Sequence, residues 1–401
     1  MGSRRIRDAF WNTLGSGAFA AISFTLLIVV TRRYGVPSAA AIGVSVTTAQ
    51  ILFRIGVFAA SQYQITDVDE KYSFAEYGAA KIRSTLLSFA LFAIFVLANI
   101  KMDCLLACIL LFLFFQLLSV DDLFQNRFFQ KGRLDLAGKS KFFVIIGFLA
   151  VFTSSTLGGL NLEIAISASL FVSFLLSYIF CFRRERLLVN SDSMIGGREV
   201  LLLCLPAFAS NILLTLVNSM PKYAVYYMRT KVESGYVNNI FIILSVVELL
   251  GSFIYYPFIA EITEALRTNR SLAGKILFKL SMAILGVALI VTTFSFFYGA
   301  QLLSLIYGTD FAAYTFEIVY TIGICGFFLA ITSLFNWVPI IIRDQKSLLR
   351  IFTIGFLVSF AGIMYGTRSF GLRGSMIGYS VGIGIISAAL VGYSIHVVRK
   401  E

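Results

Sequence analysis

The chain has 401 residues, of which 58% are apolar, 15% are aromatic and only 13% are charged, and its formal net charge is +12. Soluble domains carry roughly 25% charged residues, so this composition excludes a soluble globular protein and indicates a polytopic membrane protein. The apolar runs do not alternate with a period of two, which excludes a transmembrane β-barrel and leaves a bundle of helices. The positive charge reflects membrane topology and is no argument for nucleic acid binding.

Twelve apolar runs are long enough to cross the hydrocarbon core as helices. The predicted spans cover residues 10–30, 38–62, 82–100, 104–126, 141–158, 162–182, 200–228, 235–262, 276–298, 312–342, 349–367 and 374–398. The basic start of the chain is not followed by a small-residue cleavage site, so the first run is interpreted as an uncleaved helix. Pro206 and Pro221 interrupt the seventh run, and the tenth is long enough to tilt or to include an interfacial turn.

The distribution of Lys and Arg orients these spans. Twelve spans place both termini on one side, which carries 24 of the 33 basic residues, whereas the other side carries eight and Arg54 lies inside the second span. Because cytoplasmic loops are enriched in Lys and Arg, both termini are predicted to be cytoplasmic. The longest loops, near 63–81 and 183–199, have only about twenty residues, which excludes a separate catalytic or nucleotide-binding domain.

The sequence carries no motif of a catalytic site. GxxxxGK[ST], HExxH and GxSxG are absent, and the one histidine, His396, stands at the end of the last span, where an interfacial ring is a commoner role than proton transfer. The five cysteines lie in or beside spans without metal-ligand spacing and are interpreted as packed free thiols. We therefore expect no catalytic residue, no metal and no cofactor, and the chain is not expected to be an enzyme.

Two pairs of spans share a short pattern. FFVIIGFLA at 142–150 and IFTIGFLV at 351–358 share Ile-Gly-Phe-Leu, and each follows a basic loop and leads to a glycine-bearing turn. The fifth and sixth spans thus correspond to the eleventh and twelfth, which predicts two parallel six-helix repeats. Such halves usually enclose a substrate site near the membrane midplane and alternate its access.

Segments along nearly the whole chain carry a resemblance to one transporter family. They are LGSGAFAAISFTLLIVVTRRYGVPSAAAIGVSVTTAQIL, SQYQITDVDEKYSFAEYGAAKIR, FFQKGRLDLAGKSK, NSMPKYAVYYM, QLLSLIYGTDFAAYTFEIVYTIG and GLRGSMIGYSVG, in this order. They resemble the Wzx-type O-antigen and capsule repeat-unit flippases, the polysaccharide transporter family of the multidrug/oligosaccharidyl-lipid/polysaccharide (MOP) superfamily.

The resemblance implies an all-α integral membrane protein with two six-helix lobes, 1–198 and 199–401, around a central cavity. It implies that undecaprenyl-diphosphate-linked oligosaccharide crosses from the cytoplasmic to the outer leaflet by alternating access, for cell-surface polysaccharide and lipopolysaccharide synthesis. It also implies a bacterial cytoplasmic membrane and contact with the lipid bilayer, and it leaves open whether the transporter works alone or with a polymerase. The alternative is an ion-coupled multidrug or cation antiporter of the same superfamily, whose cavity would favour acidic residues over basic ones.

An intramembrane arginine is the first candidate for substrate contact. Arg54 lies about 22 Å along the second span from its outer end, at 1.5 Å per residue, and an arginine at such depth is a functional candidate by default. Its planar guanidinium suits the oxygens of a diphosphate. Glu248 lies at a similar depth in the eighth span. Three interpretations stay open: substrate or gating contact by Arg54, an ion pair of Arg54 with Glu248, and pairing of Arg54 with another local group. An Arg54–Glu248 pair that breaks could serve as a gate.

Further cations are predicted at the outer ends of the first and seventh spans, namely Arg32, Arg33, Lys222, Arg229 and Lys231. They could receive the diphosphate near the outer headgroups, and the helix is expected to bend at Pro221, beside Lys222. The alternative is that they reach lipid phosphates and anchor helix ends. A role in diphosphate binding is favoured for Arg32 and Lys222, together with Arg54, and both interpretations stay open for the others.

A glycan would be bound by aromatic rings, on which sugar faces stack, and by amides, which exchange hydrogen bonds with hydroxyls. The candidates are Gln50, Asn211, Asn218, Tyr223, Tyr226, Tyr227, Asn238, Asn239, Tyr255, Tyr256, Asn336 and Trp337. Many of the 18 tyrosines are expected to pack or to line the membrane interfaces.

Acidic residues within spans are the candidates for ion coupling. Glu248 is the deepest, and Asp121, Asp122, Asp310 and Glu317 are predicted to flank spans. Glu248 is therefore the best single carrier of H⁺ or Na⁺. A structural role for it, with transport driven by consumption of the flipped lipid, stays open.

Overall fold

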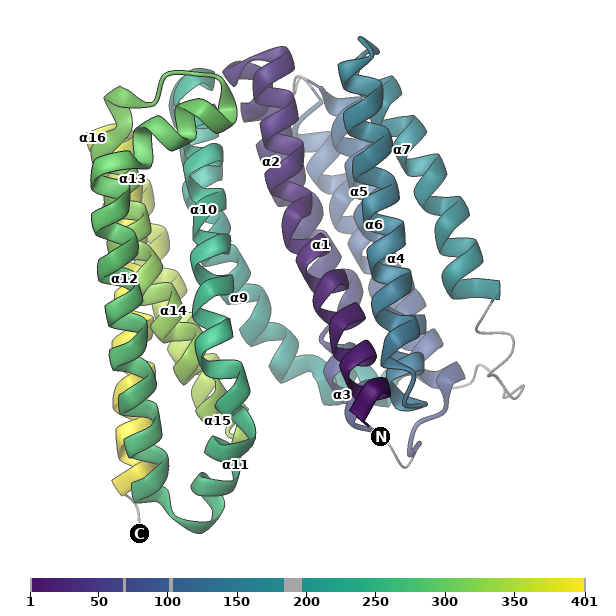
Figure 1. The fold of residues 1–401 in the computed structure, drawn as a ribbon, viewed down its shortest axis with the longest axis vertical. Helices are drawn as coiled ribbons and strands as arrows, with labels where there is room; N and C mark the ends of the chain where they lie inside the picture. Colours follow the sequence, from purple (N-terminus) through teal and green to yellow (C-terminus); the bar gives the residue numbers. More distant parts are fainter. Residues whose placement is uncertain (1, 68–69, 101–103, 184–196, 400–401) are drawn as a thin grey trace. The chain divides into compact units, whose positions relative to one another are not determined.

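The computed structural model describes residues 2–67, 70–100, 104–183 and 197–399, and none of these lies in a β-strand (Figure 1). Within them, 11 helices are long and apolar enough to cross a membrane. One of the 11, α16 (Gln345–Arg399), contains a non-helical residue at Gly371 and thus consists of two helices. The prediction of an all-α integral membrane protein with about twelve spans is confirmed.

The chain forms two compact units, which we name unit 1 and unit 2. Unit 1 comprises Met1–Arg33 and Ala41–Phe208, and unit 2 comprises Tyr34–Ala40 and Ala209–Glu401. The chain therefore passes from one unit to the other inside helices and not in loops.

Within the described residues, unit 1 contains the following helical segments (Figure 1). They are α1 (Gly2–Tyr34), α2 (Val36–Val57), α3 (Ala60–Thr66), α4 (Phe74–Ala98), α5 (Leu105–Gln130), α6 (Leu134–Leu157), α7 (Leu162–Ser177) with its π-helical end η1 (Tyr178–Phe182), and the start of α9 (Arg198–Met228). Helices α6 and α7 approach closely, because a Cβ at Gly147 would overlap Leu176 and Ser173 donates a hydrogen bond to the Val144 carbonyl at 3.3 Å. The predicted loop over 183–199 lies largely outside the described residues.

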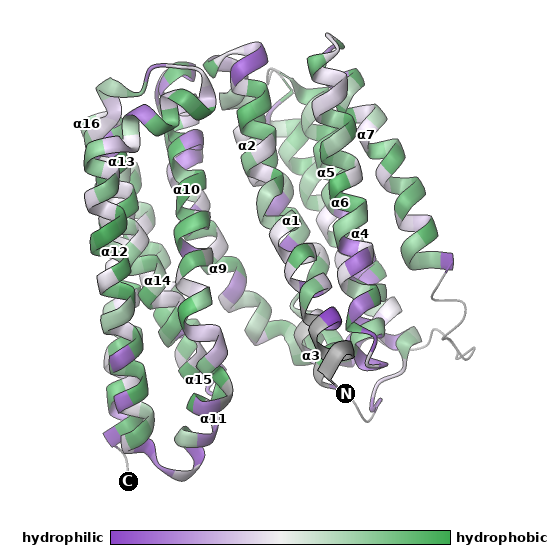
Figure 2. Ribbon diagram, in the orientation of Figure 1, coloured by the Kyte–Doolittle hydropathy of each residue, from purple (hydrophilic) through white to green (hydrophobic). Residues whose placement is uncertain are grey.

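Unit 2 contains the rest of α9 and the helices that follow it. They are α10 (Lys231–Tyr255), η2 (Tyr256–Phe258), α11 (Ile259–Thr268), α12 (Arg270–Tyr307), η3 (Ala312–Tyr314), α13 (Thr315–Tyr320), η4 (Thr321–Cys325), α14 (Gly326–Phe335), α15 (Trp337–Ile341) and α16. In α12, hydrophilic residues gather toward one end and hydrophobic residues fill the rest (Figure 2). The predicted tenth span is a series of short helices, since 3-10 and π segments precede α14.

The two halves of α16 fold back on each other through glycines. Gly371 has φ 62°, a left-handed conformation that glycine adopts without steric cost, and it makes the turn. A Cβ at Gly374 would overlap the Gly366 carbonyl, and one at Gly378 would overlap the backbone of Gly362. The two helices therefore touch backbone to backbone, an approach that small residues allow in membrane proteins.

Two of the predicted spans differ from the structure in whether the helix is continuous. The second, predicted as one helix over 38–62, breaks at Phe58 and Ala59, which have φ values of 52° and 55°. The predicted interruption of the seventh span is wrong, because α9 continues through Pro206 and Pro221. In a membrane bundle, neighbouring groups can satisfy the carbonyl that a proline leaves unbonded, so the helix need not end there.

Candidate functional site

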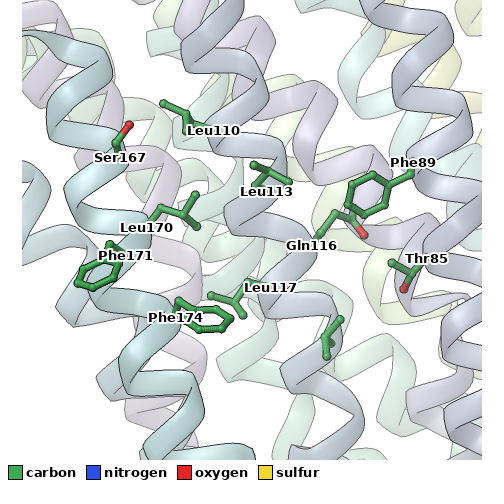
Figure 3. A pocket seen from close by; sticks show the side chains of 11 residues that line it. Thr85, Phe89, Leu110, Leu113, Gln116, Leu117, Ser167, Leu170, Phe171 and Phe174 are labelled. Atoms are coloured by element: carbon green, nitrogen blue, oxygen red, sulfur yellow. The ribbon is translucent and has the colours of Figure 1, made fainter.

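An apolar groove of about 530 Å³ lies on unit 1 between α4, α5 and α7 (Figure 3). Phe89, Phe171 and Phe174 line it together with aliphatic side chains. The amide nitrogen of Gln116, the largest polar side chain along it, donates to Ser88 Oγ at 2.9 Å. The groove therefore suits a hydrocarbon chain and not a charged headgroup.

Arg54 lies in the last turn of α2, next to the break in that helix. Its side chain is exposed, and within the described residues of unit 1 it forms no ion pair. The left-handed conformation costs roughly 1–2 kcal/mol for a residue with a Cβ, and Phe58 and Ala59 both adopt it. Such strain persists only where the surrounding structure holds it, and it clusters at functional sites.

Helix α4 holds the broken end of α2. Ser84 Oγ and the buried Lys81 Nζ both donate to the Gly56 carbonyl, at 2.7 and 3.1 Å, and Ser88 donates to the Leu52 carbonyl at 2.9 Å. These three donors follow one face of α4, because residues three, four and seven apart align on a helix. They satisfy the carbonyls of Leu52 and Gly56 and so hold the backbone of α2 on both sides of Arg54.

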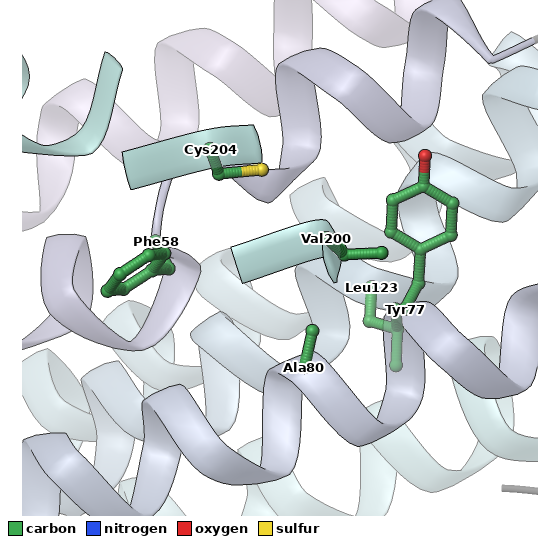
Figure 4. Packing of buried hydrophobic residues seen from close by; sticks show 6 residues of the cluster. All are labelled: Phe58, Tyr77, Ala80, Leu123, Val200 and Cys204. Carbon is green, nitrogen blue, oxygen red and sulfur yellow. The ribbon is translucent and has the colours of Figure 1, made fainter. Parts of the chain in front are cut away.

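A packed cluster covers the other side of the break (Figure 4). Phe58 is buried in it with Tyr77, and Val200 and Cys204 from the start of α9 complete it. The ring of Phe208 stacks on that of Phe58, with centroids 4.0 Å apart. The first turns of α9 thus belong to the core of unit 1.

We expect Phe208→Ala to lower the free energy of unfolding by about 2–3 kcal/mol, because it removes a stacked ring and leaves a cavity beside Phe58. Thermal melting of the purified protein in detergent would measure the loss. The control is Phe294→Ala, which truncates an exposed ring on α12. Equal melting temperatures for Phe208→Ala and the native chain would contradict the packing role of this ring.

Lys141 is a cation of unit 1 that the sequence did not single out. Its span was predicted to begin at residue 141, but α6 begins at Leu134, so Lys141 lies about 10 Å into the helix at 1.5 Å per residue. Its Nζ is 4.9 Å from the centroid of the Phe19 ring. It is close enough to interact electrostatically with Arg54, unfavourably, and with Asp122, favourably. Lys141 thus has one cation, Arg54, and one carboxylate, Asp122, in its electrostatic surroundings.

The acids of α5 lie deeper than predicted. Asp121 and Asp122 were expected to flank a span ending at 126, but α5 continues to Gln130 and Asp121 is fully buried. Asp121 accepts a hydrogen bond from Ser177, and Asp122 accepts from Ser61 and from Asn126, the latter at 3.0 Å. Glu317 of α13, which was also expected to flank a span, is buried too. Arg373 Nε donates a hydrogen bond to it at 2.7 Å.

Lys222, the cation of unit 2 that was favoured for diphosphate binding, lies inside α9. Lys222 is partly buried and, within the described residues of its unit, forms no ion pair. Tyr223 and Tyr227 follow it with parallel rings whose centroids are 6.4 Å apart, and Tyr226 meets Tyr227 edge to face at 5.2 Å. This segment of α9 therefore combines a cation with an aromatic surface.

Glu248 lies in α10 among hydroxyl groups. Ser333 Oγ donates to Glu248 Oε1 at 3.3 Å, and Tyr255 and Tyr256 are close enough to interact with it electrostatically. Trp337 stands beside them, with its ring centroid 6.2 Å from that of Tyr256. Glu248 belongs to unit 2 and Arg54 to unit 1, so their pairing stays a prediction.

The other predicted cations lie at helix ends. Arg32 and Arg33 are exposed in the last turn of α1, and Lys231 is exposed at the start of α10. Arg229 pairs with Glu233 at 3.2 Å and lies over Gly371, so its charge is partly neutralised.

Several of the predicted glycan contacts have partners inside the protein. Gln50 donates to Ser23 Oγ at 2.8 Å, and Asn218 accepts from the Tyr379 hydroxyl at 2.9 Å. Asn238 is fully buried and donates to the Ser234 carbonyl at 3.0 Å. The aromatic side chains of α9 remain the more accessible candidates, since Tyr227 is 55% exposed.

The fold defines a class of protein. No protein-family model matches the chain, and no curated protein does. Among solved structures, it is similar to transporters of the MATE family of the MOP superfamily.

Three of these structures cover nearly the whole chain. The inward-facing conformation of a multidrug resistance MATE transporter has a TM-score of 0.66 at 14% identity, covering 94% of both chains. The eukaryotic MATE transporter AtDTX14 has a TM-score of 0.66 at 15% identity, covering 98% of both chains. The Vibrio cholerae transporter VcmN, in its bent form, has 0.61 at 13% identity, covering 99% of this chain and 97% of its own. At these identities the similarity establishes the fold.

Proposed function

We propose that the protein is a flippase that moves undecaprenyl-diphosphate-linked oligosaccharide repeat units across the bacterial cytoplasmic membrane. The observation that carries this proposal is Lys141, which lies within a membrane-spanning helix and is close enough to interact electrostatically with the cation Arg54 and with the acid Asp122. The transporter fold agrees with this role.

The physical argument is that a diphosphate cannot enter a membrane protein without cations. A charge taken from water into an apolar medium costs many kcal/mol unless it is paired. Two like charges held together repel each other, and a bound anion would convert that repulsion into attraction. An arginine binds two phosphate oxygens at once, and a lysine adds a point charge.

The same proposal assigns roles in unit 2. Lys222 would meet the diphosphate, and Tyr223, Tyr226 and Tyr227 would offer rings for sugar faces. Glu248 would carry H⁺ or Na⁺ if transport is coupled to an ion. The bias of Lys and Arg supports cytoplasmic termini, and a polymerase would consume the flipped lipid on the outer side.

A multidrug antiporter is the second candidate, and Glu248 is the observation in its favour. A carboxylate among Tyr255, Tyr256 and Trp337 offers both charge and aromatic faces to an organic cation. The similar solved structures include transporters described as conferring multidrug resistance.

One reconstitution separates the two candidates. The purified chain is placed in liposomes with a fluorescent undecaprenyl-diphosphate oligosaccharide, and access of a membrane-impermeant quencher to the lipid is followed with time. Parallel liposomes contain ethidium and a proton gradient. We expect protein-dependent lipid exposure and no ethidium movement. Ethidium transport without lipid flipping would overturn the flippase and establish the antiporter.

A further inference from the structure

A second cationic cluster lies on unit 1, away from Arg54, at the first turns of α6. Asp135 accepts a hydrogen bond from Arg133 Nε at 3.1 Å, and Arg7 and Lys139 approach its other oxygen to 3.9 Å. We propose that Arg7, Arg133 and Lys139 bind the headgroup of an anionic phospholipid of the surrounding bilayer.

The charge of this cluster calls for an anion. Three cations surround one carboxylate, which leaves a surplus of two positive charges. The Asp135 side chain is only 4% exposed, whereas those of Arg7 and Arg133 are 53% and 43% exposed. The carboxylate is enclosed and the cations face outward, so an external phosphate can reach them.

The cluster is held by a rigid backbone contact. A Cβ at Gly138 would overlap the backbone of Trp11, and one at Gly15 would lie 2.8 Å from the Gly138 carbonyl. Helices α1 and α6 thus touch directly, next to Asp135. Lys139 Nζ sits 5.3 Å from the centroid of the Trp11 ring. The helix backbones that carry the cations are therefore fixed relative to each other before a lipid binds, which reduces the entropy lost on binding.

The surface beside the cluster fits the apolar part of a phospholipid. Phe10, Phe143 and Ile146 are 56%, 37% and 37% exposed. Phe10 and Phe143 contact Trp11, with ring centroids 5.7 and 5.8 Å away, and Ile146 follows Phe143 on the same face of α6. Indole rings favour the membrane interface. The cations that would bind the headgroup therefore lie next to rings that would contact the acyl chains, which is the arrangement that a bilayer lipid requires.

Trp11 makes this inference directly measurable. The chain has two tryptophans, so Trp337→Phe leaves Trp11 as the sole tryptophan, whose fluorescence is excited selectively at the red edge of the absorption band. The protein is reconstituted in phosphatidylcholine with increasing fractions of brominated phosphatidylglycerol or, in parallel, brominated phosphatidylcholine, and quenching of Trp11 gives the relative affinity of each lipid. We expect a preference for phosphatidylglycerol that falls about fivefold for each cation removed, measured with Arg133→Gln and Lys139→Gln.

Two controls keep the result unambiguous. Lys275→Gln removes an exposed cation of unit 2 and is expected to leave the preference unchanged, and Arg133→Lys, which keeps the charge, is expected to retain it. Equal quenching by both lipids in the native background, or a preference that survives Arg133→Gln with Lys139→Gln, would overturn the proposal. The readout is independent of transport, so failure of the flippase function would leave it standing.

Discussion

Arg54→Ala is expected to reduce flipping of the fluorescent lipid-linked oligosaccharide at least tenfold in liposomes. A hydrogen bond to a charged group contributes about 1.5–3 kcal/mol, and Arg54 would form two such bonds with a diphosphate. Because the side chain is exposed and forms no ion pair with the part of unit 1 that the structure describes, its removal should not unfold the protein, and the melting temperature of the variant should match that of the native chain.

Two further variants sharpen this result. Arg54→Lys keeps the charge but not the planar fork, so intermediate transport is expected. Lys141→Ala should impair transport in the same direction, and combining it with Arg54→Ala should give less than the sum of the separate losses, since both residues would bind one anion. Transport that persists undiminished in a folded Arg54→Ala protein would remove Arg54 from the translocation path and leave a structural role.

Gly374→Val is expected to destabilise unit 2 severely. A Cβ at this position would overlap the Gly366 carbonyl, which is backbone and cannot rotate away. The two halves of α16 would have to separate, at a cost of about 3 kcal/mol or more. Size-exclusion chromatography after heating should show a melting temperature lower by on the order of 10 °C.

The matched control is Gly286→Ala on α12. A Cβ there meets nothing within 4 Å, and alanine in a helix interior is favoured over glycine by about 0.5–1 kcal/mol. This variant should be as stable as the native chain or slightly more so. If Gly374→Val melted with the native chain, the close contact between the halves of α16 would be refuted.

The twelve spans could be predicted because membrane helices depend on length and hydropathy, which are properties of local sequence. The turn at Gly371 is equally local, since spans ending near 367 and beginning near 374 were separated by charged and glycine residues. The depth of charged residues within the membrane-spanning helices was harder to predict. Lys141 and Asp121 carry charge, and a charged residue near the end of an apolar run is assigned by default to the interface.

The sequence did not reveal features that depend on contacts between residues distant in the chain. The break in α2 contains neither proline nor glycine at Phe58 and Ala59, and it is held by Lys81 and Ser84 from another helix. The electrostatic interaction of Lys141 with Arg54 joins residues of α6 and α2, which lie far apart in the chain. No pattern in a single sequence records such a neighbour. The continuity of α9 through Pro206 and Pro221 is likewise not a local property, since in a membrane bundle neighbouring groups can satisfy the carbonyl that a proline leaves unbonded.

Helix α9 contributes residues to both units, and this has a consequence for the synthesis of the protein. Val200 and Cys204 fill the core of unit 1, so that core stays incomplete until the beginning of α9 has been synthesised. A gene divided just before Gly197 would yield a first fragment with Phe58 and Tyr77 uncovered and a second one without Tyr34–Ala40. The two pieces would therefore accumulate only when produced together, as complementing fragments and not as autonomous modules.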